Sequence, residues 1–318
     1  MSEIEASTAM LTEPEAPAVK GPLVWLDMDQ KELDDAYDQA CWAPNREHIQ
    51  KRRRLASERT IARIGPPECV AYGPTEIEKL DIYKTDRANA PVMIFIHGGA
   101  WRGGYAKDSA YMAEMYLTAG AHFVIPDFVW VQNAGGSLMA MADQVRRAVA
   151  WVYKNAAGFG GDPNRLYLSG HSSGGHLGGV VTITDWRKDS GLPADIIKGA
   201  LLISGMYDLK PVRLSKRSQY INFDDATEEA LSTQRHIDKI PMPLTIAHGT
   251  LESPEFQRQS RDFAAAVKAK GKPVEFFVGE GFNHFEMQET MGNPFGLGGR
   301  AALEMMKLGI GKARGARH

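Results

Sequence analysis

The feature that most constrains the fold of this chain is the pentapeptide Gly170-His171-Ser172-Ser173-Gly174, which follows the apolar run 165–169. A run of small residues, 175–179, comes directly after it. A serine between glycines at this spacing is typical of a tight strand-to-helix turn that carries a nucleophile. The glycines leave room where backbones approach, and the helix directs the positive end of its dipole toward the turn. We therefore expect Ser172 to act as a nucleophile.

A second motif lies upstream, where the apolar run 91–96 ends in His97-Gly98-Gly99. A continuous apolar run of this length is typical of a strand buried on both faces. Glycines after such a strand let backbone amides approach a carbonyl oxygen, and this type of loop usually supplies one side of an oxyanion hole. Together the two motifs predict a nucleophilic serine faced by amide donors.

A serine hydroxyl needs an imidazole to take its proton and a carboxylate to orient that imidazole. The sequence contains nine histidines, and the position of each in the chain must decide which one supplies this imidazole. His284 follows the last expected strand, 274–278, and ligand sites in α/β sheets lie at the carboxyl ends of the strands. We expect His284 to be the base, and His97 to fix its own loop by a hydrogen bond.

The acid should precede the base in the chain, in the loop after the strand 244–248. Glu252 and Glu255 both lie there. We favour Glu252, because Glu255 follows Pro254 and is expected to open the next helix. Asp208, after an earlier expected strand, is a third candidate for the acid.

Strands and helices alternate along the chain, which predicts a mostly parallel sheet covered by helices on both faces. The expected strands are 69–72, 78–83, 91–96, 121–127, 165–169, 199–204, 244–248 and 274–278, and the expected helices include 109–118, a segment that starts at residue 139 and stops at Gly158, and 300–308.

Composition bounds the domain organisation. At 318 residues, 43% hydrophobic and 24% charged, the chain is long enough for one large α/β domain. Residues 1–20 are acidic and contain prolines, and we expect a mobile tail there. We expect a single domain over residues 21–318, in which residues 21–65 form a helical flap near the active site, with a break at 43–45.

Charge and cysteine content exclude several classes of protein. The net charge of −2 gives no basic field for nucleic acid, and we interpret the basic run 51–54 as a solvated helix face. The two cysteines are too few for a disulfide framework. We expect no metal, because His171 and His176 lack a third ligand and no zinc motif is present. No cofactor is expected either.

The sequence shows neither a secretory leader at its start nor an apolar run long enough to span a membrane. We therefore expect a cytoplasmic protein whose partner is a small molecule, with neither nucleic acid nor membrane as a partner. The sequence leaves a homo-oligomer open. Three tryptophans, Trp101, Trp130 and Trp186, are candidates for the wall of a substrate pocket.

The segments His97-Gly98-Gly99-Ala100-Trp101, 170–177 and Thr184-Asp185-Trp186 together resemble the arylformamidase (kynurenine formamidase-like) branch of the α/β-hydrolases, and the esterase/lipase branch with its H-G-G-G loops is also similar. The resemblance covers the chain from about Asp27 to its last helix. It implies a triad of Ser172, His284 and an acid at Glu252, with the amides of Gly98, Gly99 and Ser173 as the oxyanion hole.

Two departures from that branch bear on the substrate. Arylformamidases often carry a bulky aromatic residue where this chain has Ala100, and their acid is usually Asp where this chain offers Glu252. We therefore expect a serine hydrolase of carboxylic esters or N-formyl aryl amides, with esters slightly favoured, acting through an acyl-enzyme. A lyase or a binding protein of the same fold is the alternative hypothesis.

Overall fold

The computed structural model describes residues 20–309, which are built on an eight-stranded sheet of order β10-β9-β8-β7-β5-β6-β4-β3. Its strands from β10 to β6 are parallel, and β3 and β4 are antiparallel to their neighbours. The predicted mostly parallel sheet is confirmed. The strands are β3 (Glu68–Ala71), β4 (Lys79–Tyr83), β5 (Ala90–Ile96), β6 (His122–Pro126), β7 (Gly161–His171), β8 (Ile197–Ile203), β9 (Leu244–Gly249) and β10 (Val274–Gly279).

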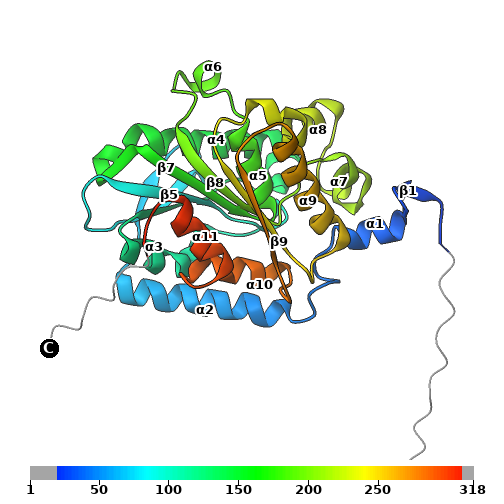
Figure 1. Cartoon of the computed structure of the whole chain (residues 1–318), viewed down its shortest axis with the longest axis horizontal. Coiled ribbons are helices and arrows are strands. Elements are labelled where there is room, and N and C mark those ends of the chain that lie inside the picture. Colours follow the sequence, from blue (N-terminus) through cyan, green and yellow to red (C-terminus); the bar gives the residue numbers. More distant parts are fainter. Residues whose placement is uncertain (1–19, 310–318) are drawn as a thin grey trace, which may run out of the picture.

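The sheet has a hydrophobic core on each face, because successive side chains of a strand point to opposite sides. In β5, Ile94 belongs to one core with the helices α4, α5 and α9, whereas Phe95 belongs to the other with α3 and α11. Figure 1 shows these two helical layers above and below the strands. Both faces are thus covered, as the unbroken apolar strand sequences predict.

The helices in the described part of the chain differ widely in length, and 3₁₀ turns join several of them. The α-helices are α1 (Gln30–Ala36), α2 (Arg46–Ile64), α3 (Ala113–Ala119), α4 (Leu138–Asn155), α5 (Ser173–Thr182), α6 (Trp186–Ser190), α7 (Lys210–Leu214), α8 (Asp225–Leu231), α9 (Pro254–Ala269), α10 (His284–Glu289) and α11 (Leu297–Met305), and the 3₁₀ helices are η1 (Ala106–Met112), η2 (Val131–Ala134), η3 (Ala156–Phe159), η4 (Lys216–Gln219), η5 (Thr233–Lys239) and η6 (Thr290–Gly292).

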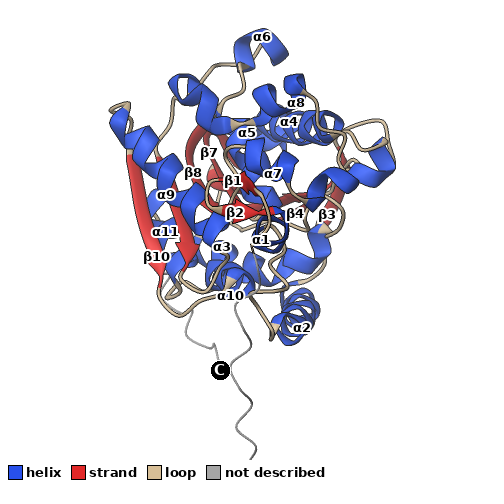
Figure 2. Cartoon of the chain, turned by 90° about the vertical axis from the view of Figure 1, so that its right-hand side faces the viewer, coloured by secondary structure: helices blue, strands red, loops and turns tan. Residues whose placement is uncertain are grey.

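The N-terminal segment precedes the sheet and packs across its carboxyl edge. It contains the short ribbon β1 (Leu23–Trp25) and β2 (Met28–Asp29), then α1 and α2. Figure 2 shows β1, β2 and α1 in front of the sheet, between β10 at one edge and β3 at the other. The tail predicted for residues 1–20 lies outside the described residues, except for Lys20.

Two element boundaries differ from the predicted ones. The helix predicted at 109–118 is a 3₁₀ helix, η1, followed by α3. The helical spacing that continues past Ala36 does not extend α1, because the Asp38 carboxylate accepts a hydrogen bond from the amide of Ala40 at 3.0 Å. Such local side-chain bonds compete with helical ones and turn the chain. The turn leads into α2, which packs beside α10.

Candidate active site

Ser172 lies on the turn between β7 and α5, with φ 60° and ψ −127°, a region that residues other than glycine rarely adopt. A side chain could not replace either flanking glycine. A Cβ on Gly170 would lie 2.3 Å from the carbonyl oxygen of Gly174, and one on Gly174 would lie 2.0 Å from that of Ile96. The pentapeptide is thus required by the close approach of three backbone segments, and it holds Ser172 in a strained conformation.

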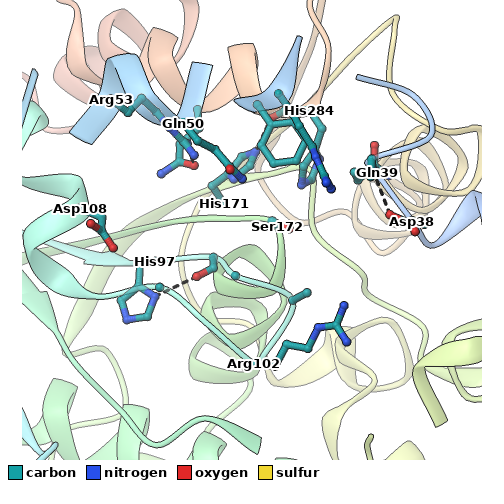
Figure 3. Close-up of a pocket in the computed structure, with 18 of the residues that line it drawn as sticks. Asp38, Gln39, Gln50, Arg53, His97, Arg102, Asp108, His171, Ser172 and His284 are labelled. Atoms are coloured by element: carbon teal, nitrogen blue, oxygen red, sulfur yellow. Dashed lines mark hydrogen bonds between the residues drawn. The ribbon is translucent and has the colours of Figure 1, made fainter. Parts of the chain in front are cut away.

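His284 and Glu252 form a buried pair after the two adjacent strands β10 and β9. His284 Nδ1 lies 2.8 Å from Glu252 Oε2, and both side chains are almost fully buried. Since an ionised carboxylate only accepts hydrogen bonds, Nδ1 carries the hydrogen and Nε2 keeps a lone pair. Figure 3 shows His284 beside Ser172 at the cavity that both residues line.

The Glu252 carboxylate has further donors. Ser204 donates its hydroxyl to Oε1 at 2.6 Å, and the amide of Gly249 donates to the same oxygen at 2.7 Å. Burial raises the pKa of Glu252, and these two hydrogen bonds oppose the rise because they favour the charged form. Each carboxylate oxygen therefore has a defined partner, which fixes the orientation of His284.

His171, the residue before Ser172, contacts His284 from the other side. Its Nε2 donates to the carbonyl oxygen of His284 at 2.8 Å, and the two ring centroids lie 4.5 Å apart. Burial lowers the pKa of His284, and the positive charges of Arg217 and Arg53 lower it further. The imidazole is therefore kept neutral, the form that accepts a proton.

The His-Gly-Gly loop lies directly against the nucleophile. A Cβ on Gly98 would lie 3.2 Å from the Cβ of Ser172, and Gly99 has φ +130°. The next two residues, Ala100 and Trp101, also have positive φ values, 55° and 62°. This unusual backbone brings the loop to Ser172 and to the start of α5, where the amide of Ser173 lies. His97 Nδ1 donates to the carbonyl oxygen of Gly98 at 2.9 Å and so fixes the loop.

A cavity of about 650 Å³ opens above Ser172. The sheet side supplies the loop after β5, the serine turn and His284, whereas the loop after α1, together with α2 and η4, supplies the opposite side. Figure 3 shows Ser172 between His284 and His171 on one side and His97 and Arg102 on the other. The lining residues are Tyr37, Asp38, Gln39, Ala40, Arg46, Gln50, Arg53, Arg54, His97, Gly98, Gly99, Ala100, Arg102, Gly104, Tyr105, Asp108, Ser109, His171, Ser172, Lys216, Arg217, Gln219, Tyr220, His284, Phe285 and Gln288.

The two other candidates for the acid lie away from His284. Glu255 is in the first turn of α9, where it accepts hydrogen bonds from Tyr37 at 2.8 Å and from Arg258 at 2.6 and 2.8 Å. Asp208 accepts from the amide of Lys210 and pairs with Arg235. Both carboxylates therefore have structural partners of their own.

The structure brings none of the three predicted tryptophans into the cavity lining. Trp101 is 2% exposed, donates to His176 Nδ1 and lies under Arg217. Trp186 is buried at the start of α6, and Trp130 donates its indole hydrogen to the carbonyl oxygen of Gly104. Aromatic residues near a motif in sequence thus serve packing here, and the cavity wall is mainly polar.

His176 also has a packing role. Its Nδ1 accepts from Trp101 and its Nε2 donates to the carbonyl oxygen of Leu231 at 3.0 Å, while burial lowers its pKa to about 4.

Within residues 20–309, no group of three or more His, Cys, Asp or Glu side chains could hold a metal ion. No helix of this range is long and apolar enough to cross a membrane.

Several lining residues were missed by sequence reasoning. Arg53 was assigned to a solvated helix face, and that interpretation is wrong, because Arg53 is half-buried and donates to the amide oxygen of Gln288. Arg102 and Arg217 carry no motif at all. For Tyr37, its place as an aromatic residue in the predicted flap was a weak indication that it would line the cavity. Ser204 directly follows β8 with φ 55°, and nothing in the sequence points to its contact with Glu252.

A mostly parallel sheet with a serine on the turn after a central strand, and a histidine–carboxylate pair after later strands, defines the class of α/β-hydrolases. The BD-FAE family model matches residues 80–200. The kynurenine formamidase of Danio rerio is 29% identical over 281 residues, and that of Salmo salar is 30% identical over 286. Each alignment covers 84% of this chain and 93% of the relative. Further relatives of lower identity are esterases.

Solved structures show the same fold. A putative thioesterase from Silicibacter sp. TM1040 superposes with a TM-score of 0.73 at 20% identity, covering 83% of this chain and 96% of that one. The chain belongs to the arylformamidase and esterase branch of the α/β-hydrolase superfamily, and it is a hydrolase of the esterase or arylformamidase type.

Proposed function

We propose that this chain is a serine hydrolase that cleaves N-formyl aryl amides and carboxylic esters through an acyl-enzyme, with Ser172, His284 and Glu252 as its triad. The observation that carries the proposal is that His284, which is paired with the buried Glu252, lines the same cavity as the strained Ser172. A neutral imidazole with a free Nε2, beside a serine held in an unfavourable conformation, is suited to proton transfer from that serine.

In the first half of the reaction, Ser172 Oγ attacks the substrate carbonyl carbon while His284 Nε2 takes the hydroxyl proton. The negative charge that develops on the carbonyl oxygen is bound by the backbone amides of Gly98, Gly99 and Ser173, each donor being worth about 3–4 kcal/mol in related sites. The tetrahedral intermediate then collapses. The amine or alcohol leaves with the proton from His284, and the acyl group stays on Ser172.

In the second half, a water molecule gives a proton to His284 and attacks the acyl-enzyme. The same amides bind the second oxyanion, and the Ser172–acyl bond breaks as His284 returns the proton to Oγ. The products are an amine or alcohol and a carboxylic acid, which is formate for an N-formyl substrate. Glu252 keeps the hydrogen on Nδ1 of His284 throughout and stabilises the imidazolium that forms twice per cycle.

The relatives' names and the cavity support N-formyl aryl amides as well as esters. Kynurenine formamidases are the relatives at 29% and 30% identity. A volume of about 650 Å³ suits a single aryl ring with substituents. We further propose that residues 21–65 act as a flap on this single domain, because Tyr37, Gln39 and Gln50 line the cavity.

The test compares hydrolysis of a short-chain aryl ester and an N-formyl aryl amide by the wild type and by Ser172→Ala. We expect both substrates to be cleaved and both activities to fall by about 10⁴-fold or more in the variant. A fluorophosphonate should label the wild type at Ser172 alone. Turnover that survives in Ser172→Ala, without any covalent adduct in the wild type, would instead assign an acid–base lyase to this site.

A further inference from the structure

Positively charged side chains dominate the lining of the cavity. Six basic and two acidic side chains face it, namely Arg46, Arg53, Arg54, Arg102, Lys216 and Arg217 against Asp38 and Asp108. Fixed charges of one sign in a cleft create a potential that raises the local concentration of the opposite charge. The net charge of the whole chain is −2, so this excess belongs to the cavity and not to the protein in general.

Both acidic residues of the lining are already engaged. The Asp38 carboxylate lies 2.8 Å from Lys216 Nζ and accepts the amide of Ala40. The Asp108 carboxylate caps its own helix by accepting the amide of Tyr105 at 3.2 Å. A cationic group on a ligand would have to compete with these partners, whereas an anionic group meets unpaired guanidinium groups.

Arg217 is the most buried of these cations, with 5% of its surface exposed. Its Nε and Nη2 donate to the carbonyl oxygen of Tyr37 at 3.1 and 2.8 Å, and its guanidinium carbon lies 5.2 Å from the centre of the Trp101 ring. Nη1 is buried with no hydrogen-bond partner, and no carboxylate of the described chain forms an ion pair with Arg217. The Asp38 carboxylate interacts with Arg217 through its charge, but it forms its ion pair with Lys216. A buried charge without an ion pair of its own is costly, and an anion bound nearby would lower that cost.

Arg102 lines the same cavity as Arg217. The two are linked through adjacent contacts, because Arg217 lies over Trp101 while Arg102 lies over Tyr220, 4.6 Å from its ring centre. Arg102 is exposed and, in the part of the chain described by the structure, forms no ion pair. The contact with the Tyr220 ring holds its guanidinium group in place, and the N–H groups of an arginine without an ion pair can bind a planar anion.

Arg53 lies across Ser172 from Arg102, and Figure 3 shows it beside Gln50 on α2. In the described chain its side chain donates a hydrogen bond to the amide oxygen of Gln288, a neutral group. Arg53 and Arg217 are both close enough to His284 for their charges to act on it. The nucleophile is therefore flanked by cations on both sides of the cavity.

We propose that this cavity selects substrates that carry a carboxylate and no cationic group, with Arg102 and Arg53 as the specificity-determining side chains and Arg217 as a buried charge behind them. The inference rests on the proposed function, since the carboxylate is a substituent of the amide or ester that Ser172 cleaves. It narrows that function from aryl formamides and esters in general to anionic ones, and it disfavours neutral and zwitterionic analogues of the same size.

Three N-formyl anilines test the charge of the substrate: para-formamidophenylacetate, its neutral carboxamide of the same shape, and the zwitterion para-formamidophenylalanine, which is one carbon longer. We expect kcat/KM for the acetate to exceed that for the carboxamide by about tenfold or more, the range of a hydrogen bond to a charged group. The zwitterion should be no better than the carboxamide. Equal or faster cleavage of the carboxamide or the zwitterion would overturn the proposal.

Arginine variants then locate the preference. Arg102→Gln and Arg53→Gln should each lower the acetate-to-carboxamide ratio of kcat/KM by about tenfold. Arg187→Gln is the matched control, because Arg187 is exposed on α6, at the opposite end of the molecule from α2 in Figure 1, and it should leave the ratio unchanged. If both cavity variants slow the two substrates equally, the cations act on the chemical step and the proposal fails.

A binding measurement separates this inference from the proposed function. Ser172→Ala is titrated calorimetrically with para-aminophenylacetate and with its carboxamide. The acetate should bind about tenfold more tightly, with a difference that shrinks as salt screens the charges. Equal binding by an enzyme that still shows Ser172-dependent turnover would overturn only the anion preference. Preferential binding by a protein without turnover would support the anion site and overturn the proposed function.

Discussion

On the sheet side of the cavity, the groups that orient the base are all paired: the Glu252 carboxylate has three donors, and the carbonyl of His284 has His171. On the helical side, formed by the loop after α1 and by α2 and η4, Arg53 and Arg217 line the same cavity and form no ion pair with a carboxylate of the described chain. The hydrogen bonds of the sheet side are complete without a ligand, whereas the helical side keeps positive charges that no ion pair balances.

This difference separates two tasks. Proton transfer needs groups fixed within a few tenths of an ångström, and a closed hydrogen-bond network provides that. Recognition needs unsatisfied groups, because a ligand gains affinity only from contacts that the empty protein lacks. Variants of the sheet side should therefore lower kcat most, whereas variants of the helical side should change how its charges act on His284.

The largest effect is expected for Glu252→Gln. The side-chain oxygen of the variant would stay with the donors Ser204 and Gly249, so an NH₂ group, which cannot accept the Nδ1 hydrogen, would face His284. His284 then loses its defined tautomer, and kcat should fall by about 10⁴-fold. Glu255→Gln is the matched control, since Glu255 contacts Tyr37 and Arg258 but not His284. It should lower stability while changing kcat less than about tenfold. A larger loss of kcat in Glu255→Gln than in Glu252→Gln would assign the role of the acid to Glu255.

A smaller effect is expected for Ser204→Ala, which removes the 2.6 Å hydrogen bond to the Glu252 carboxylate. A buried charge that loses one donor should lower the free energy of unfolding by about 1.5–3 kcal/mol, measured by urea denaturation, and should lower kcat by about tenfold. Ser260→Ala provides the control, because its hydroxyl is equally buried and has no partner. If Ser204→Ala and Ser260→Ala lost the same amount of stability and of kcat, the hydrogen bond from Ser204 to Glu252 would contribute to neither.

The smallest effect is a shift in pH dependence. The free enzyme needs neutral His284, so kcat/KM falls as pH drops through the pKa of that residue. The charge of Arg53 lowers this pKa, and therefore Arg53→Gln should raise it and move the acid limb of the pH profile to higher pH. A neutral aryl ester is the substrate for this measurement, and Arg187→Gln should leave the limb in place. A shift toward lower pH in Arg53→Gln would contradict the electrostatic contact.

The sheet side is the part that the sequence predicts well, because its signals are local. Unbroken apolar runs mark the buried parallel strands, and Ser172, Glu252 and His284 each lie in the loop or turn that follows one of them. Carboxyl ends of parallel strands lie at one edge, so Ser172, Glu252 and His284 must approach one another once the strand order is known. The choice between Glu252 and Glu255 followed from Pro254, which opens α9 as expected.

The helical side could not be predicted in the same way. Its residues come from segments far apart in sequence, and their positions depend on how α2 packs against α10. The buried hydrogen bonds from Arg217 to the carbonyl oxygen of Tyr37 join residues 180 positions apart. Conversely, Trp101 and Trp186 flank motifs in the sequence, yet they pack into the core because large aromatic surface is best buried. Proximity to a motif was a poor guide to proximity to the cavity.

The bond from His171 to the carbonyl of His284 joins residues 113 positions apart, and it has a consequence for the order in which the chain matures. During synthesis, the serine turn emerges long before β10 and the base. Long-range contacts of this kind form late, because loop closure has to precede them. A chain interrupted anywhere before residue 284 contains Ser172 without the histidine that we propose as its proton acceptor, so we expect reactivity to arise only when the last strand of the sheet has been added.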